Sequence, residues 1–128
     1  MLKLATFPNP NNSSDLIVRL CWEHRLEGWF SHAMFDEYAS VLAGESELLA
    51  LVQEHFQLCF PLTEINWIKH EPDNRFLECA LAVDSDYLIT VNTARGHFDQ
   101  TNYGRARVLT PDAFVNLPEV QKLLKHIA

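Results

Sequence analysis

The sequence predicts an α/β fold in which helices cover both faces of a mostly parallel sheet. In several segments apolar residues recur at the three-and-four spacing of helices, and short β-branched or aromatic runs separate these segments. The 128 residues contain no internal repeat and no linker long enough to separate domains. We therefore expect one domain over residues 1–128.

The expected elements follow from caps, stops and apolar runs taken in chain order. Ser31 is expected to cap one helix, Gly28 to end another and Thr110-Pro111 to begin a third. We expect strands at 1–6, 29–31, 56–60, 87–91 and 105–109, helices at 15–27, 31–42, 45–55, 73–83, 110–117 and 119–127, a helical turn within 63–69 and a polar loop over 93–104.

The central helix and strand place polar groups at one end of the sheet. Pro72 disfavours helix before it and Asp73 is a good N-cap, so the helix is expected to begin at Asp73 or just after it. The run 87–91 then forms a buried strand, and Asn92 lies just past its carboxyl end. Ligands of open α/β sheets bind outside the carboxyl ends of the strands, so polar groups there are the first candidates for chemistry.

Charge and composition narrow the class of protein. The formal charge of −7 disfavours a broad electrostatic contact with nucleic acid, although a small acidic site can reach phosphates through bound cations. Cys21, Cys59 and Cys79 form no Cys-x-x-Cys pair and are expected to be buried reduced thiols. No apolar run approaches the roughly 18 residues that span a membrane, and the N-terminus lacks the pattern of a secretory signal. We therefore expect a cytoplasmic protein without a membrane partner.

Three residues carry oxygen atoms that the expected topology can bring to one edge. Glu37 lies in an early turn of its helix, Asp73 at the start of the central helix and Asn92 beyond the central strand. Carboxylate and amide oxygens suit Mg²⁺ or Mn²⁺, and such a site can activate water to cleave a phosphodiester. The spacing also permits a plainer interpretation, in which Glu37 is a solvated helix residue, Asp73 only a cap and Asn92 a turn former.

Other polar side chains give weaker signals. Arg95, Arg105 and Arg107 are expected to flank the same edge, where they contact either phosphates or solvent. No zinc-ligand spacing is present among the histidines, which are His24, His32, His55, His70, His97 and His126.

Four runs of residues carry a resemblance to a known family. They are Glu71-Pro72-Asp73-Asn74-Arg75-Phe76-Leu77-Glu78-Cys79-Ala80, Ser85-Asp86-Tyr87-Leu88-Ile89-Thr90-Val91-Asn92, His97-Phe98 and Arg107-Val108-Leu109-Thr110-Pro111-Asp112-Ala113-Phe114. Together they resemble the PIN-domain family, and more narrowly its branch of toxin components of toxin–antitoxin pairs. Members of that branch read D-N-x-F-L-E-C-A, then A-D-Y-L-V-T-G-D or T-G-N, then H-F and I-L-T-P-x-x-F.

The resemblance implies a fold and a function. The fold is a three-layer α/β/α sandwich with a mostly parallel sheet, and the activity is that of a ribonuclease that prefers single strands and uses Mg²⁺ or Mn²⁺. Glu37, Asp73 and Asn92 match the family's catalytic and metal-binding positions, whereas His97 matches the H-F pair without an assigned role. The implied partners are single-stranded RNA, an antitoxin protein and a second copy of the chain.

The sequence departs from the family pattern at its start. The family opens with a strand ending in D-T-N, whose aspartate binds metal, and residues 1–12 align best with the part after it. Val91 also replaces the usual glycine. We expect weakened catalysis, and a less favoured alternative is that Asp99 or Asp36 compensates for the missing ligand. Two alternatives are an inactive PIN-like module that binds a protein or RNA, and a coding sequence that truly starts upstream of Met1.

Overall fold

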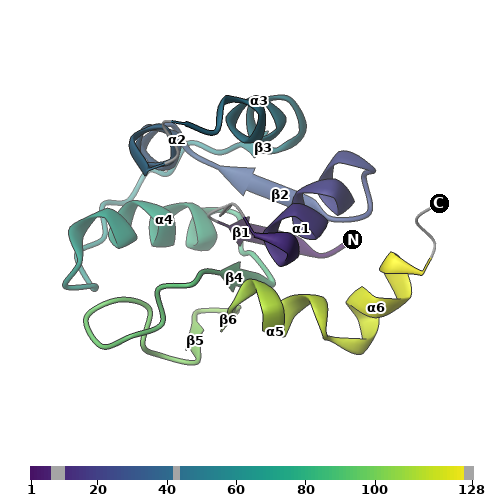
Figure 1. Cartoon of the computed structure of the whole chain (residues 1–128). Coiled ribbons are helices and arrows are strands. Elements are labelled where there is room, and N and C mark those ends of the chain that lie inside the picture. The colour runs from purple at the N-terminus through teal and green to yellow at the C-terminus, as the bar shows by residue number, and fades with distance from the viewer. Residues whose placement is uncertain (7–10, 42–43, 126–128) are drawn as a thin grey trace.

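A six-stranded sheet forms the centre of the molecule (Figure 1). The structure, a computed structural model, describes residues 1–6, 11–41 and 44–125. Within these residues the strand order is β3-β2-β1-β4-β6-β5. The strands are β1 (Lys3–Thr6), β2 (Glu27–Phe30), β3 (Gln57–Leu58), β4 (Tyr87–Ile89), β5 (Asn102–Tyr103) and β6 (Ala106–Leu109).

Most neighbouring strands run parallel. β1 lies between β2 and β4, so that Ala5 pairs with Trp29 on one side and with Leu88 on the other, and β6 continues the parallel order beyond β4. β5 pairs with β6 in the antiparallel direction. Leu4, Ala5, Leu88 and Ile89 are fully buried, which places the core against the two central strands. The carboxyl ends of β1, β2, β4 and β6 therefore meet at one edge, here called the carboxyl edge.

Helices flank the sheet on both sides (Figure 1). α4 packs against β1 and β2 and contacts α2, whereas α1 contacts α3 and α5. This arrangement confirms the predicted α/β/α fold with a mostly parallel sheet. None of the helices in the described residues is long and apolar enough to cross a membrane. The helices are α1 (Asn12–Trp22), α2 (His32–Val41), α3 (Ser46–His55), α4 (Glu71–Ala82), α5 (Pro111–Val115) and α6 (Pro118–Leu124).

The prediction that Gly28 ends the first helix is wrong. α1 already ends at Trp22, and His24 takes a left-handed conformation with a φ of 58° that reverses the chain. Gly28 lies in β2, where a Cβ atom would come within 2.9 Å of the Phe56 ring. Glycine at this position therefore permits a close approach between the strand and the aromatic ring.

The central helix begins earlier than expected. α4 starts at Glu71 with His70 as its N-cap residue, so Asp73 lies within the first turn and is not the cap. Pro72 is tolerated there because the first N–H groups of a helix have no intrahelical partner. Asp73 consequently lies at the start of the helix, where its side chain contacts His97 in the loop after β4.

Several other boundaries also differ from the prediction. Residues 63–69 form no helical turn, and the expected strands at 56–60 and 87–91 shorten to β3 and β4. The expected polar loop contains the short strand β5. Ser31 and Thr110 do cap α2 and α5, by accepting hydrogen bonds from the backbone N–H groups of Met34 and Ala113. Predictions at Leu42 and Ile127 fall outside the described residues.

All three cysteines are buried free thiols, as predicted. Burial raises the pKa of Cys21 to about 12, so this thiol stays protonated at neutral pH. Cys59 and Cys79 lie 20 residues apart in sequence, yet their sulfur atoms are 2.8 Å apart. A hydrogen bond between them lowers the pKa of Cys59 and raises that of Cys79.

Candidate functional site

Asp73 is the acidic residue that the fold brings to the carboxyl edge in a buried position. Its side chain is only 8% exposed, and it comes from the first turn of α4. Negative charge is favoured there, because the free N–H groups of a helix start carry a partial positive charge. A buried carboxylate nevertheless needs specific partners to offset its loss of hydration.

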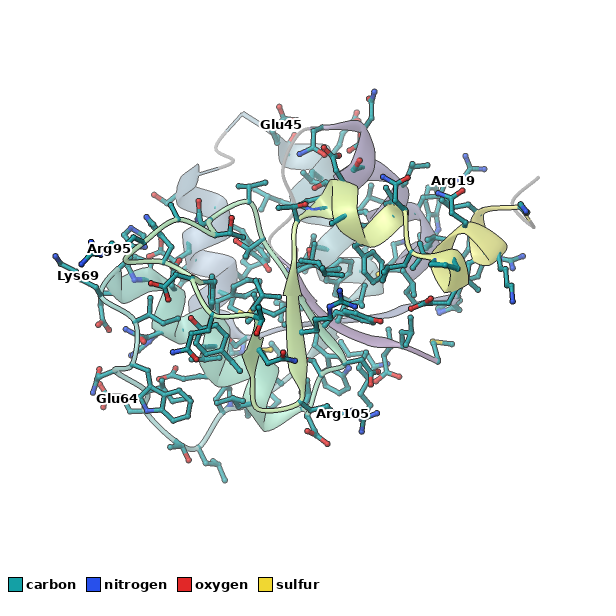
Figure 2. All side chains as sticks on the ribbon, turned by 90° about the horizontal axis from the view of Figure 1, so that it is seen from below. Arg19, Glu45, Glu64, Lys69, Arg95 and Arg105 are labelled. Carbon is teal, nitrogen blue, oxygen red and sulfur yellow. The ribbon has the colours of Figure 1, made fainter. Side chains whose placement is uncertain are left out.

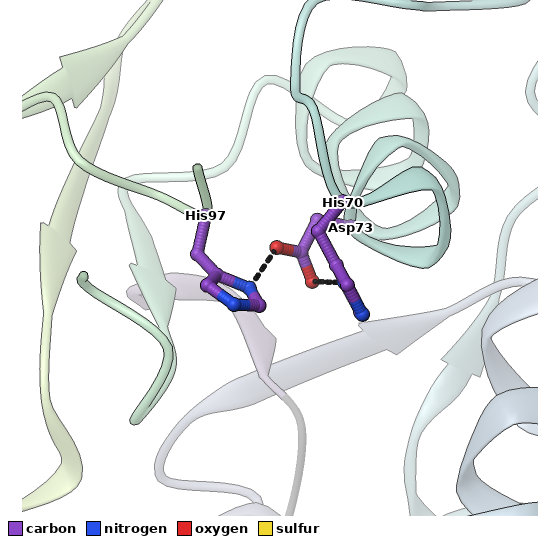
Figure 3. A group of neighbouring side chains, drawn as sticks. All are labelled: His70, Asp73 and His97. Atoms are coloured by element: carbon purple, nitrogen blue, oxygen red, sulfur yellow. Dashed lines mark hydrogen bonds and ion pairs between the residues drawn. The ribbon is translucent and has the colours of Figure 1, made fainter. Parts of the chain in front are cut away.

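Two histidines supply these partners (Figure 3). The His97 Nδ1 atom lies 2.9 Å from one oxygen of Asp73, and the His70 Nδ1 atom lies 3.3 Å from the other. The two imidazole rings are close to each other, with their centroids 4.5 Å apart. Asp73 is thus bracketed by two rings that come from different parts of the chain.

The histidines show no zinc-ligand spacing in the sequence, yet the fold brings His70 and His97 to the carboxylate of Asp73. One ligand atom from each of His70, Asp73 and His97 lies within 4.8 Å of the others, and we call these residues the His-Asp-His cluster. One signal was present in the sequence, because His70 precedes Asp73 by three residues and i,i+3 side chains meet on a helix. His97 carried no comparable signal.

Backbone hydrogen bonds fix the loop that carries His97. The Phe98 N–H donates to the Asn92 carbonyl at 3.0 Å, and the His70 N–H donates to the Gly96 carbonyl at 3.0 Å. Gly96 has a φ of 88°, a conformation that other residues rarely adopt. These contacts join the loop after β4 to the start of α4, so the two histidines are held close together.

The residues that follow Asp73 attach a second segment to α4. Asn74 is fully buried, and its side-chain amide accepts from the Ile68 N–H at 2.8 Å and donates to the Ile68 carbonyl at 2.9 Å. Arg75 donates to the Ile65 carbonyl, while Glu78 accepts from the Ile65 N–H, each at 2.8 Å. Much of the motif around Asp73 therefore maintains the structure, and Asp73 itself faces the site.

Glu37 and Asn92 lie outside the cluster, although Asn92 follows β4 at the carboxyl edge. Glu37 is half-buried in α2, next to Tyr38, whose hydroxyl donates to the carbonyl of Thr6 at the end of β1. Asn92 is exposed, and its backbone closes the loop by donating to Thr90 and accepting from Phe98. Glu37 is absent from the ligand grouping found among the described His, Cys, Asp and Glu residues. Metal ligation by Glu37 and Asn92 stays a prediction.

The compensating ligands proposed from the sequence are likewise outside the cluster. Asp36 and Asp99 are both exposed, and neither joins the grouping found in the described part of the chain. Two carboxylates nevertheless affect the pKa of Tyr103. Burial is the main cause that raises the pKa of Tyr103, and the carboxylates of Asp99 and Asp73 raise it further.

A comparison with protein families assigns the chain. A family model of the PIN domain matches residues 1–94, well over half of the sequence. The chain belongs to the PIN-domain family. Neither a curated protein nor a solved structure matches it. PIN domains are generally nucleases that act with divalent metal ions and bind RNA.

The matched range includes most of the candidate site residues. Glu37, His70, Asp73 and Asn92 lie in the matched range, whereas His97 follows it. The contact between His97 and Asp73 is therefore an observation of the structure and does not come from the family match.

Basic residues lie beside the His-Asp-His cluster of this PIN domain. Lys69 precedes His70 and Arg95 precedes Gly96, and Figure 2 shows the two side chains close together. Both are exposed. The expectation that Arg105 and Arg107 flank the site is wrong, because Arg105 pairs with Asp86 at 2.7 Å and Arg107 lies opposite Tyr87, both near the amino end of β4.

An apolar groove of the PIN domain is lined by residues that come after the edge strand β3 in the sequence and by residues of α4. Its volume is about 480 Å³. Phe60, Leu62 and Trp67 line it and are 68%, 99% and 67% exposed. Large exposed apolar side chains that gather in one place are typical of protein-interaction surfaces.

Proposed function

We propose that this PIN domain is a metal-dependent endoribonuclease that cleaves single-stranded RNA and acts as the toxin of a toxin–antitoxin pair. The observation that carries the proposal is the buried carboxylate of Asp73 at the carboxyl edge of a PIN fold. The partners found for it among the described side chains are imidazoles, and a divalent cation bound to the carboxylate would further offset its charge.

The ion is proposed to be Mg²⁺ or Mn²⁺, held by Asp73 with Glu37 and Asn92. When bound, such an ion supplies a more acidic water molecule and stabilises the charge of the phosphate under attack. Asp73 is proposed to orient the ion, while Lys69 and Arg95 bind the flanking phosphates of the strand.

The proposal is tested by the Asp73→Asn variant in a cleavage assay on single-stranded RNA with Mn²⁺. We expect cleavage to fall by at least about 10- to 100-fold, the loss typical even of residues that only support a metal ligand. Asp15→Asn removes an exposed acid from α1 and should leave the rate unchanged. If the wild type and Asp73→Asn cleave equally, the cleavage comes from a contaminant, and the proposal that this protein is a nuclease is rejected.

A second prediction concerns RNA binding. Replacing both Lys69 and Arg95 by alanine should weaken binding of single-stranded RNA and reduce the slope of log K against log salt by about 0.7 for each lost phosphate contact. Lys122→Ala with Lys125→Ala, on exposed positions at the end of α6, changes the net charge equally and serves as the control. Equal effects of the two double variants would show that only net charge matters, and would remove Lys69 and Arg95 from the RNA site.

The apolar groove favours a second candidate function, that of a binding module for a protein. The exposure of Phe60, Leu62 and Trp67 supports such a partner, which for a toxin is the antitoxin. The two functions differ in the assay above. No Mn²⁺-dependent cleavage by the folded wild type favours the module. Association with a second copy of the chain stays a prediction.

A further inference from the structure

We propose that His70, Asp73 and His97 form a binding site for a borderline transition-metal ion of the Zn²⁺ class, in preference to Mg²⁺. The site shares Asp73 with the Mg²⁺ or Mn²⁺ site of the proposed function, and in that respect it rests on the proposed function. Its other ligands are His70 and His97, so the two assignments are alternatives for the ion at Asp73. This site depends on a different observation, however, namely that both oxygens of the buried carboxylate face an imidazole nitrogen.

The spacing of the donor atoms suits one ion. Two ligand atoms that each lie about 2.0–2.1 Å from a tetrahedral Zn²⁺ are about 3.3 Å apart. The Nδ1 atoms of His97 and His70 lie 2.9 and 3.3 Å from the oxygens of Asp73. Small side-chain rotations therefore bring one oxygen and two nitrogens around a common centre, and the ion takes the place of the proton in the hydrogen bond between His97 and Asp73.

The backbone holds the donors in place before an ion arrives. His70 is the N-cap residue of α4, and its N–H donates to the carbonyl of Gly96, the residue before His97. Phe98, directly after His97, is only 1% exposed and packs edge-to-face on Phe76 of α4. Binding thus orders few additional groups, which lowers its entropic cost.

The chemistry of the donors decides the class of ion. Mg²⁺ prefers oxygen ligands in an octahedral arrangement and keeps several waters, whereas imidazole nitrogen suits zinc and its neighbours among the transition metals. Three protein ligands leave a coordination position for water or substrate, as in catalytic zinc sites. The side chains of His70 and His97 are 48% and 30% exposed, so that position is accessible from solvent.

The test is a calorimetric titration of the full chain, without a histidine tag, with Zn²⁺ alone. We expect one ion per chain, and at least 10- to 100-fold weaker binding in His70→Ala, His97→Ala and Asp73→Asn. His55 stacks on Trp22 and does not belong to the cluster, so the His55→Ala variant should bind Zn²⁺ as the wild type does. Mg²⁺ in large excess should not compete, and Co²⁺ should give a visible absorption band that His97→Ala loses. Circular dichroism confirms that each variant is folded.

The outcomes separate this site from the proposed nuclease. Unchanged Zn²⁺ affinity in the three folded site variants overturns the site, as does displacement of Zn²⁺ by Mg²⁺. RNA cleavage by the wild type together with such a result leaves the nuclease intact. Zinc binding that depends on both histidines, without any RNA cleavage, supports the site and rejects the nuclease.

Discussion

Replacing Asn74 by alanine should lower the free energy of unfolding by about 2–4 kcal/mol, because it leaves a buried N–H and a buried carbonyl of Ile68 without partners. Asn74 is fully buried, and its amide holds both groups at 2.8 and 2.9 Å. Chemical denaturation monitored by tryptophan fluorescence measures the change.

Two other variants sharpen this prediction. Asn74→Asp keeps an oxygen to accept from the Ile68 N–H, but it places a buried carboxylate opposite the Ile68 carbonyl and the Glu71 carboxylate, so its cost should be at least as large. Asn116 also donates from its side chain to a backbone carbonyl, that of Asp112, but it is exposed. Asn116→Ala should therefore change stability by no more than about 0.5 kcal/mol. If Asn74→Ala is as mild as Asn116→Ala, Asn74 does not hold the segment before α4.

The elements that the sequence predicted best are those whose signals are local. Phe76, Leu77 and Ala80 recur at helical spacing and are all buried in α4, and the apolar run at 87–89 is the central strand β4. Amphipathic periodicity reports which face of an element is buried, and this holds whatever the element packs against. The α/β class followed from these signals.

Predictions failed where distant residues determine the local structure. Residues 63–69 form no helical turn because Asn74, Arg75 and Glu78 bind backbone groups of Ile65 and Ile68. Gly28 was interpreted as a helix end, whereas the proximity of Phe56, 28 residues later, requires a glycine in β2. Neither contact leaves a periodic pattern in the sequence.

The candidate site was predicted in part. Asp73 was chosen as an acid at the carboxyl edge, and the structure places it there. Its partners were missed because His97 follows it by 24 residues, across α4 and β4, and only the parallel crossover brings them together. Spacing rules for metal ligands cover residues within one turn or loop, so a site assembled from a helix start and a distant loop escapes them.

The second large effect is expected at Phe98, the residue after His97. Phe98→Ala should lower the free energy of unfolding by about 3–5 kcal/mol, the usual cost of removing a buried phenylalanine side chain. Phe98 is 1% exposed and packs edge-to-face on both Phe76 and Tyr103, at centroid distances of 5.4 and 5.7 Å. Such a loss is comparable to the total stability of many domains, so Phe98→Leu, with an expected cost of about 1 kcal/mol, provides a milder variant.

A matched control distinguishes local anchoring from general destabilisation. Phe114 is fully buried and packs edge-to-face on Tyr87, so Phe114→Ala should cost a similar amount of stability without touching the loop of His97. Hydrogen exchange of the amides of His70 and Phe98, which are bonded to Gly96 and Asn92, reports on that loop. Exchange at these amides should accelerate in Phe98→Leu more than its global stability explains, and Phe114→Leu should show no such excess. Equal behaviour of the two variants would mean that Phe98 contributes to the core alone, and that the polar contacts of the loop suffice to position His97 beside Asp73.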